Sequence, residues 1–252
     1  MRRGALPPLS SRRLSFKLPN TSDLKIKWIA EGQGWVVLSK PAGLLSVPGS
    51  SRHGAAAEDR GGDSVETRVR ARYSEAEGGL VVHRLDLPTS GLMVFALTSQ
   101  TLAHLNQQFA QRTTAKRYTA VLDRAPRAAQ GDVRLPLRLD PFQRPLQIVD
   151  PVHGRPAHTR WEVIGTHPLG VLVDLEPVTG RTHQLRLHAA HPLGMNAPIV
   201  GDPHYSRDAT ADGTSPHGLR LHLHASALSF DDPQTGERLS FVDPAPFSAT
   251  GI

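Results

Sequence analysis

The sequence predicts an α+β protein built on a mixed, mostly antiparallel sheet. Apolar segments of strand length recur along the chain and are separated by short turns that contain glycine or proline. Helical patterns are few and lie far apart, and no repeat of fixed period is present. The chain has 252 residues, of which 38% are hydrophobic, so it can bury a sizeable core.

Alternating or continuous apolar segments predict the strands. Two such segments joined by a short turn predict a hairpin, and the sequence contains three such pairs. The hairpins are expected at about 26–30 with 35–39, 157–164 with 171–177, and 221–230 with 237–243, and single strands at 92–97 and 116–123.

Three helices are predicted. A short polar helix is expected at about 64–73, and a longer one at 99–111, where apolar residues recur at i, i+3 and i+7. The segment "VTGRTHQLRLHAA" offers Thr179 as a helix cap and contains no helix breaker before Pro192. We therefore expect the third helix to begin just after Thr179.

The excess positive charge lies at the N-terminus. The net charge is +6, and residues 1–27 carry seven basic side chains against the single acid Asp23. Because this stretch lacks apolar periodicity, residues 1–22 are expected to form a flexible basic arm. Such an arm could bind phosphates or could be a solvated tail. A transit peptide is disfavoured, because Pro7 and Pro8 would interrupt an amphipathic helix.

The remaining chain is predicted to form one domain over residues 23–252. A stretch rich in Ser, Gly and Ala predicts a flexible loop at about 49–62. No run approaches the length of a membrane span, so we expect a soluble, cytoplasmic protein without a membrane partner. The absence of cysteine excludes disulfides, a thiol nucleophile and Cys-ligated zinc.

Thirteen histidines raise the alternative of a metallohydrolase with a His-ligated metal. The spacing disfavours it. His183 and His188 lie five residues apart, which places them roughly 140° apart around a helix. No HExxH pattern is present. We therefore expect no metal.

Two segments carry unusual charges. If residues 81–87 of "VVHRLDLPTSG" are extended, Arg84 and Asp86 share one face, and the simplest interpretation is a solvent-facing ion pair. In "GRTHQLRLH", Arg181 lies in the first turn of the predicted helix, where the helix dipole disfavours a cation. Arg181 therefore either has an anionic partner, a carboxylate or a phosphate, or points outward.

The motifs taken together resemble the RluA family of RNA pseudouridine synthases. The resemblance extends from Ile26 to Pro246 and is closest to the short branch that lacks an S4 domain. The matching motifs occur in the family's order: "LSKPAGLLSVPG", "HRLDLPTSG", "KRYTAVL", "VTGRTHQLRLH" and "RLHLHA". The family stretch "PIVGDPHY" is also present, after a slightly longer connection.

The resemblance implies a pseudouridine synthase fold with a central active-site cleft, and an isomerase that converts uridine to pseudouridine in structured RNA. The RNA would be 23S rRNA, the tRNA anticodon arm, or both. A monomer without cofactor or metal is expected. A noncatalytic RNA-binding module of the same fold is the alternative, and the retention of Asp86 and Arg181 argues against it.

The resemblance also assigns residue roles. Asp86 corresponds to the essential aspartate, Arg181 to the cation that holds it ionised, and Tyr118 to the tyrosine that packs on the uracil. Contacts with the substrate are expected from four further residues. Leu223 would line the opposite side of the base, Arg84 would stabilise the flipped-out nucleotide, and His83 and Thr89 would support the loop at the substrate.

Overall fold

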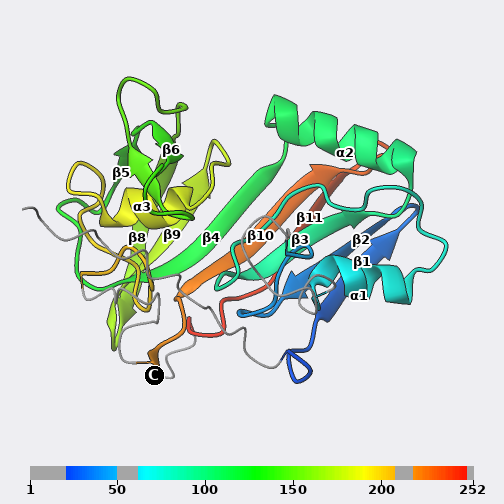
Figure 1. Ribbon diagram of the computed structural model, residues 1–252, viewed down its shortest axis with the longest axis horizontal. Coiled ribbons are helices and arrows are strands. Elements are labelled where there is room, and N and C mark those ends of the chain that lie inside the picture. The colour runs from blue at the N-terminus through cyan, green and yellow to red at the C-terminus, as the bar shows by residue number, and fades with distance from the viewer. Residues whose placement is uncertain (1–20, 50–61, 208–217, 249–252) are drawn as a thin grey trace, which may run out of the picture.

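The computed structural model describes residues 21–49, 62–207 and 218–248, and nine of its strands form one sheet (Figure 1). These strands are β1 (Lys27–Gly32), β2 (Trp35–Lys40), β3 (Ser90–Ala96), β4 (Ala115–Leu122), β5 (Gln130–Val133), β8 (Thr159–His167), β9 (Gly170–Pro177), β10 (Leu223–Asp231) and β11 (Arg238–Val242). Their order is β1-β2-β3-β10-β4-β9-β8-β5, with β11 beside β10. Only the β3–β10 pair is parallel. The predicted mixed, mostly antiparallel sheet is confirmed.

The three predicted hairpins are present as β1–β2, β8–β9 and β10–β11, and the two predicted single strands are β3 and β4. The prediction missed β5 and a separate small hairpin of β6 (Leu137–Leu139) and β7 (Gln147–Val149). These strands have only three or four residues, which is too short for an apolar pattern to stand out.

Two helices cover opposite faces of the β2–β3 part of the sheet. They are α1 (Val65–Arg72), capped by Ser64, and α2 (Ser99–Gln111), capped by Thr98. Alternate residues of β2 and β3 enter two different cores, one containing Val65 of α1 and the other containing Leu105 of α2. Both strands are therefore buried on both faces, which explains their continuous apolar sequences.

The third helix, α3 (Gln184–Ala190), packs on β4 and β9. Leu185 and Ala189 contribute to a core with Leu175 and Leu223. Tyr118 of β4 packs against this core and also against the α1 core. Tyr118 therefore lies between the core under α3 and the core under α1.

The predicted start of the third helix was wrong. α3 begins at Gln184, and the residue before it, His183, has a left-handed backbone with φ of 53°. The Thr179 hydroxyl does not cap the helix; it donates to Gln184 Oε1 at 2.7 Å and accepts the His158 N–H at 2.9 Å. Arg181 thus lies in the loop before the helix, outside its first turn.

Residues 81–87, whose shared face for Arg84 and Asp86 depended on an extended segment, do not form a regular strand. This segment has one isolated bridge, from Val81 to Phe95, and otherwise runs as a loop. Leu85 shows why: its N–H donates to Ser46 Oγ at 3.1 Å, and its carbonyl accepts from the same hydroxyl at 2.7 Å. Because one side chain satisfies both backbone groups, Leu85 is buried without a neighbouring strand.

The predicted arm over residues 1–22 lies outside the described residues except for its last two positions, and most of the predicted loop at 49–62 does as well. Among the helices that the structure describes, none has the length and hydrophobicity to cross a membrane.

We predict that Gly91→Ala lowers the free energy of unfolding by about 2 kcal/mol or more. Gly91 has φ of 112°, and a Cβ there would lie 2.4 Å from the carbonyl oxygen of Ala225 on β10. Urea denaturation measures the change. Gly165→Ala is the matched control, because nothing lies within 4 Å of its added Cβ. Equal stability of the two variants would contradict this account of the β3–β10 contact.

Candidate active site

Asp86 lies on the loop before β3, and hydrogen bonds to backbone carbonyls fix the part of this loop that follows Asp86. The Thr89 N–H donates to the Asp86 carbonyl at 3.0 Å. Lys40, at 0% exposure, donates to the carbonyls of Leu44 at 2.7 Å and Leu87 at 3.1 Å. Burial lowers the pKa of Lys40 to about 7, and the charge of Asp86 opposes this shift. Lys40 thus joins the loop after β2 to the loop that carries Asp86.

The cation that contacts Asp86 is Arg186 on α3. Its Nη1 donates to Asp86 Oδ2 at 3.2 Å. The same guanidinium donates twice to Asp202, from Nε to Oδ2 and from Nη2 to Oδ1, each at 2.8 Å. Arg186 is 1% exposed and Asp202 is 0% exposed, so this is a buried, bidentate ion pair that extends to a third, partly exposed group.

The predicted pairing of Asp86 with Arg181 was therefore wrong. Arg181 lines the same cavity as Asp86, but its Nε donates to the Pro156 carbonyl at 3.2 Å, and no ion pair joins it to Asp86. The cause is the later start of α3: the helix begins beyond Arg181 and presents the next arginine of the motif, Arg186, to the carboxylate.

Asp202 belongs to the "PIVGDPHY" stretch, and its own loop holds it in place. Its Oδ1 accepts the N–H groups of His204 at 2.8 Å and Tyr205 at 3.1 Å. Burial opposes ionisation of Asp202, yet the hydrogen bonds and charge of Arg186 lower its pKa overall. Burial lowers the pKa of Arg186, but the hydrogen bonds and charge of Asp202, and then the charge of Asp86, raise it overall.

A hydrogen-bonded chain approaches Asp86 from a second side. The Gln147 N–H donates to the Tyr205 hydroxyl at 2.8 Å, and that hydroxyl lies 2.8 Å from His183 Nδ1. His183 Nε2 lies 3.9 Å from Asp86 Oδ2. Burial lowers the pKa of His183 to about 4, so the ring is neutral at neutral pH. A neutral imidazole carries one ring hydrogen, so a Tyr205 hydroxyl that donates to Nδ1 would leave that hydrogen on Nε2, the nitrogen that faces Asp86.

Asp86, His183 and Arg186 line a small cavity of about 70 Å³. Tyr118 and Leu223 line it from neighbouring strands, and Thr89 and Arg84 line it from the Asp86 loop. Burial, and then the charge of Asp86, raise the pKa of Tyr118, so it is a neutral phenol. Five of the predicted site residues other than Asp86 therefore lie around the same cavity: Arg84, Thr89, Tyr118, Arg181 and Leu223.

His83 has a different position from these residues. Its Nε2 accepts the Val94 N–H at 3.2 Å, and its ring stacks on Phe109 with centroids 4.8 Å apart. Burial lowers its pKa to about 3. His83 is not among the residues that line the cavity, and it attaches the Asp86 loop to β3 and α2. Its expected contact with the substrate has no support in this geometry.

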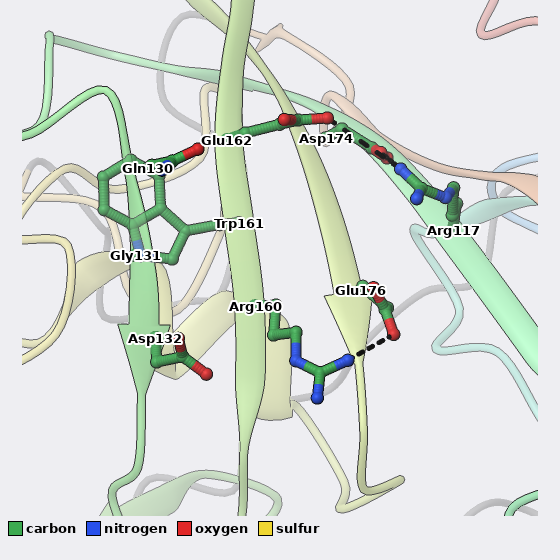
Figure 2. A pocket seen from close by; sticks show the side chains of 9 residues that line it. All are labelled: Arg117, Gln130, Gly131, Asp132, Arg160, Trp161, Glu162, Asp174 and Glu176. Carbon is green, nitrogen blue, oxygen red and sulfur yellow. Dashed lines mark hydrogen bonds and ion pairs between the residues drawn. The ribbon is translucent and has the colours of Figure 1, made fainter.

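A second hollow, here called the outer hollow, lies on strands β4, β5, β8 and β9 (Figure 2). It shares no lining residue with the Asp86 cavity. Its two arginines are paired with carboxylates, Arg117 with Asp174 and Arg160 with Glu176. In the part of the chain that the structure describes, no group of three or more His, Cys, Asp or Glu residues could hold a metal ion.

Residues 34–191 match the family model described as RNA pseudouridylate synthase. The dual-specificity RNA pseudouridine synthase RluA of Pasteurella multocida (strain Pm70) is 41% identical over 214 residues, which cover 84% of this chain and 90% of the relative. The chain belongs to the RluA family of RNA pseudouridine synthases. The same enzyme of Escherichia coli (strain K12) is 40% identical over 213 residues.

Two solved structures of pseudouridylate synthase domain proteins are similar to this chain. Human RNA Pseudouridylate Synthase Domain Containing 4 superposes with a TM-score of 0.66 at 25% identity, covering 87% of this chain and 88% of that one. Human RNA Pseudouridylate Synthase Domain Containing 1 has a TM-score of 0.68 at 23% identity, covering 91% and 86%, and supports the fold. The chain is thus an RNA pseudouridine synthase, an isomerase that acts on RNA.

Sequence reasoning gave no role in this site to four residues: His183, Arg186, Asp202 and Tyr205. Arg186 could have been found, because it stands between Leu185 and Leu187 on a predicted helix, and a buried arginine needs an acid. Its acid, Asp202, lies in a motif that was recognised but given no role. No local signal in the sequence connects Tyr205 with His183.

We predict that Arg186→Lys folds but loses about 100-fold or more of its isomerase rate, because lysine cannot donate to both carboxylates with the planar geometry of a guanidinium. Arg186→Gln leaves Asp202 buried and unpaired, at a cost of about 3–5 kcal/mol of stability. Thermal melting and single-turnover pseudouridine formation measure the two effects. A wild-type rate for Arg186→Lys would contradict the bridging role.

We predict that Tyr205→Phe slows the isomerisation about fivefold, the kinetic equivalent of the roughly 1 kcal/mol of one neutral hydrogen bond. The Tyr205 ring, whose centroid lies 5.3 Å from Arg186 Cζ, remains, but Nδ1 of His183 loses its hydrogen-bond partner. RNA affinity is expected to stay unchanged. Tyr73→Phe is the matched control, since its hydroxyl donates to Glu31 at 2.5 Å, away from the cavity. A rate loss of the same size in the control would contradict the orienting role of Tyr205.

Proposed function

We propose that this synthase modifies specific uridines in 23S rRNA, in the tRNA anticodon arm, or in both. The name of the relatives, a dual-specificity RNA pseudouridine synthase, supports more than one kind of RNA target. We also propose that it acts in the cytoplasm as a monomer, and without a metal or cofactor, because the isomerisation has no redox step. The observation that carries the proposal is the position of Asp86, partly exposed at a cavity and in contact with Arg186.

The reaction breaks the bond between uracil N1 and ribose C1′ and forms a bond between C5 and C1′. A proton leaves C5, and N1 gains one. We propose that Asp86 initiates it as a carboxylate, by attack at C1′ or at uracil C6, or by removal of a sugar proton. Arg186 suits this role because a guanidinium stays charged and contacts only one carboxylate oxygen, which leaves the other free.

We propose that the uracil lies between Tyr118 and Leu223, with Thr89 at the edge of the cavity. Because Tyr118 is a neutral phenol, it suits packing against the base better than proton removal from C5. The uridine must leave its stack to reach Asp86. Arg84 is exposed, lines the cavity, and has no hydrogen bond or ion pair among the described residues, so it can contact the phosphates or the vacated space.

Asp86→Asn is expected to abolish pseudouridine formation while RNA affinity is retained, because the variant keeps its shape but has no carboxylate. Formation is measured by pseudouridine mapping of total RNA from cells with and without each variant, which also identifies the modified positions. Asp123→Asn, an exposed carboxylate paired with Arg124, should retain full activity. Substantial turnover by Asp86→Asn would disprove the assignment.

A further inference from the structure

A groove of about 480 Å³ adjoins the Asp86 cavity. It lies between the end of α2, the start of β4 and the connection from β9 to α3. Its cationic lining residues, which define what is called the basic groove below, are Arg112, Lys116, Arg160 and Arg181.

Three of the four cations in the basic groove have no carboxylate partner among the residues that the structure describes. Arg160 is paired with Glu176 at 3.2 Å and also belongs to the outer hollow (Figure 2). Arg112, Lys116 and Arg181 take part in no ion pair there. Both arginines of the outer hollow therefore have carboxylate partners, whereas three cations of the basic groove have none among the described residues.

The unpaired cations also lie close enough to repel one another. Burial, and then the charge of Arg112, lower the pKa of Lys116. Burial, and then the charges of Arg155 and Arg112, lower the pKa of Arg181. Cations held together without an anion favour a polyanionic ligand between them, since that ligand relieves the repulsion.

The basic groove is continuous with the active site. Arg181, Gly180, Thr179 and Pro177 line both the groove and the Asp86 cavity. Arg181 also lines a further cavity beside Arg84. Its Nε is used by the Pro156 carbonyl, and its two terminal nitrogens have no partner in the described structure. Arg181 therefore stands where these three spaces meet.

We propose that the basic groove binds the phosphates of the RNA strand next to the target uridine, with Arg181 at the phosphate nearest the flipped nucleotide. This rests on the proposed function, in which the uridine enters the Asp86 cavity. A nucleic acid strand fits because its charges are regularly spaced and continue from the uridine itself. The sequence suggested a carboxylate or a phosphate as the partner of Arg181. Because Asp86 is bound by Arg186, a phosphate is the partner that we propose for Arg181.

Salt titration of RNA binding tests the proposal. The variants are Arg112→Asn, chosen because asparagine tolerates the φ of 61° at this position, and the double variant Arg112→Asn/Lys116→Gln. Fluorescence anisotropy with labelled anticodon-arm and rRNA hairpins gives affinity at several salt concentrations. Arg127→Gln is the matched control, because it removes one exposed positive charge beyond the opposite end of β4.

The slope of log affinity against log salt should fall by about 0.7–0.9 for each phosphate that the protein no longer neutralises, so by about 1.5 in the double variant. Affinity at 0.1 M salt should fall about tenfold or more, and Arg127→Gln should match the wild type. An unchanged slope in the exposed Arg112→Asn variant, with a wild-type melting temperature, would overturn the proposal. So would an equal decrease in Arg127→Gln, which would indicate only general attraction.

The binding measurement needs no turnover, so the two proposals can fail separately. If the wild type forms no pseudouridine but the salt slope of RNA binding still falls in the groove variants, the groove proposal is supported and the proposed function fails. If pseudouridine forms and the slope is unchanged, the groove proposal fails, and an acidic protein becomes the partner to examine.

Discussion

The site depends on one guanidinium that contacts two carboxylates. Arg186 is held by two hydrogen bonds to buried Asp202, and its remaining terminal nitrogen contacts Asp86. Because Asp202 is itself fixed by backbone N–H groups, the position of the cation is set before any substrate arrives. A buried pair of this kind contributes little net stability, so its value lies in fixing where the positive charge stands relative to Asp86.

The sheet brings the three participating segments together. The Asp86 loop leads into β3, the helix with Arg186 follows β9, and the Asp202 turn comes before β10, which pairs with both β3 and β4. Close packing at Gly91 allows β3 and β10 to approach, and this approach places Leu223 near Thr89 at one cavity. The remaining fold therefore serves mainly to hold a loop, a helix and a turn at fixed separations.

Two arginines of one motif have separate environments. Arg186 is buried on the helix and paired, whereas Arg181 lies in the preceding loop, with terminal nitrogens directed to no carboxylate in the described structure. Sequence spacing alone treats them alike. Their separation follows from the left-handed turn at His183, which delays the helix, and this same turn places His183 beside Asp86. One backbone feature thus determines both the partner of Asp86 and the arginine that faces the basic groove.

The sequence by itself determined the fold class, most strands and two helices, because apolar periodicity and turn residues are local signals. It also identified Asp86 and the cavity residues Tyr118 and Leu223 through family motifs. Only the tertiary structure decided that residues 81–87 form a loop, since the Ser46 hydroxyl that replaces strand pairing lies about 40 residues away along the chain. It alone decided between Arg181 and Arg186, because that choice depends on where a helix begins and on the distant, buried Asp202.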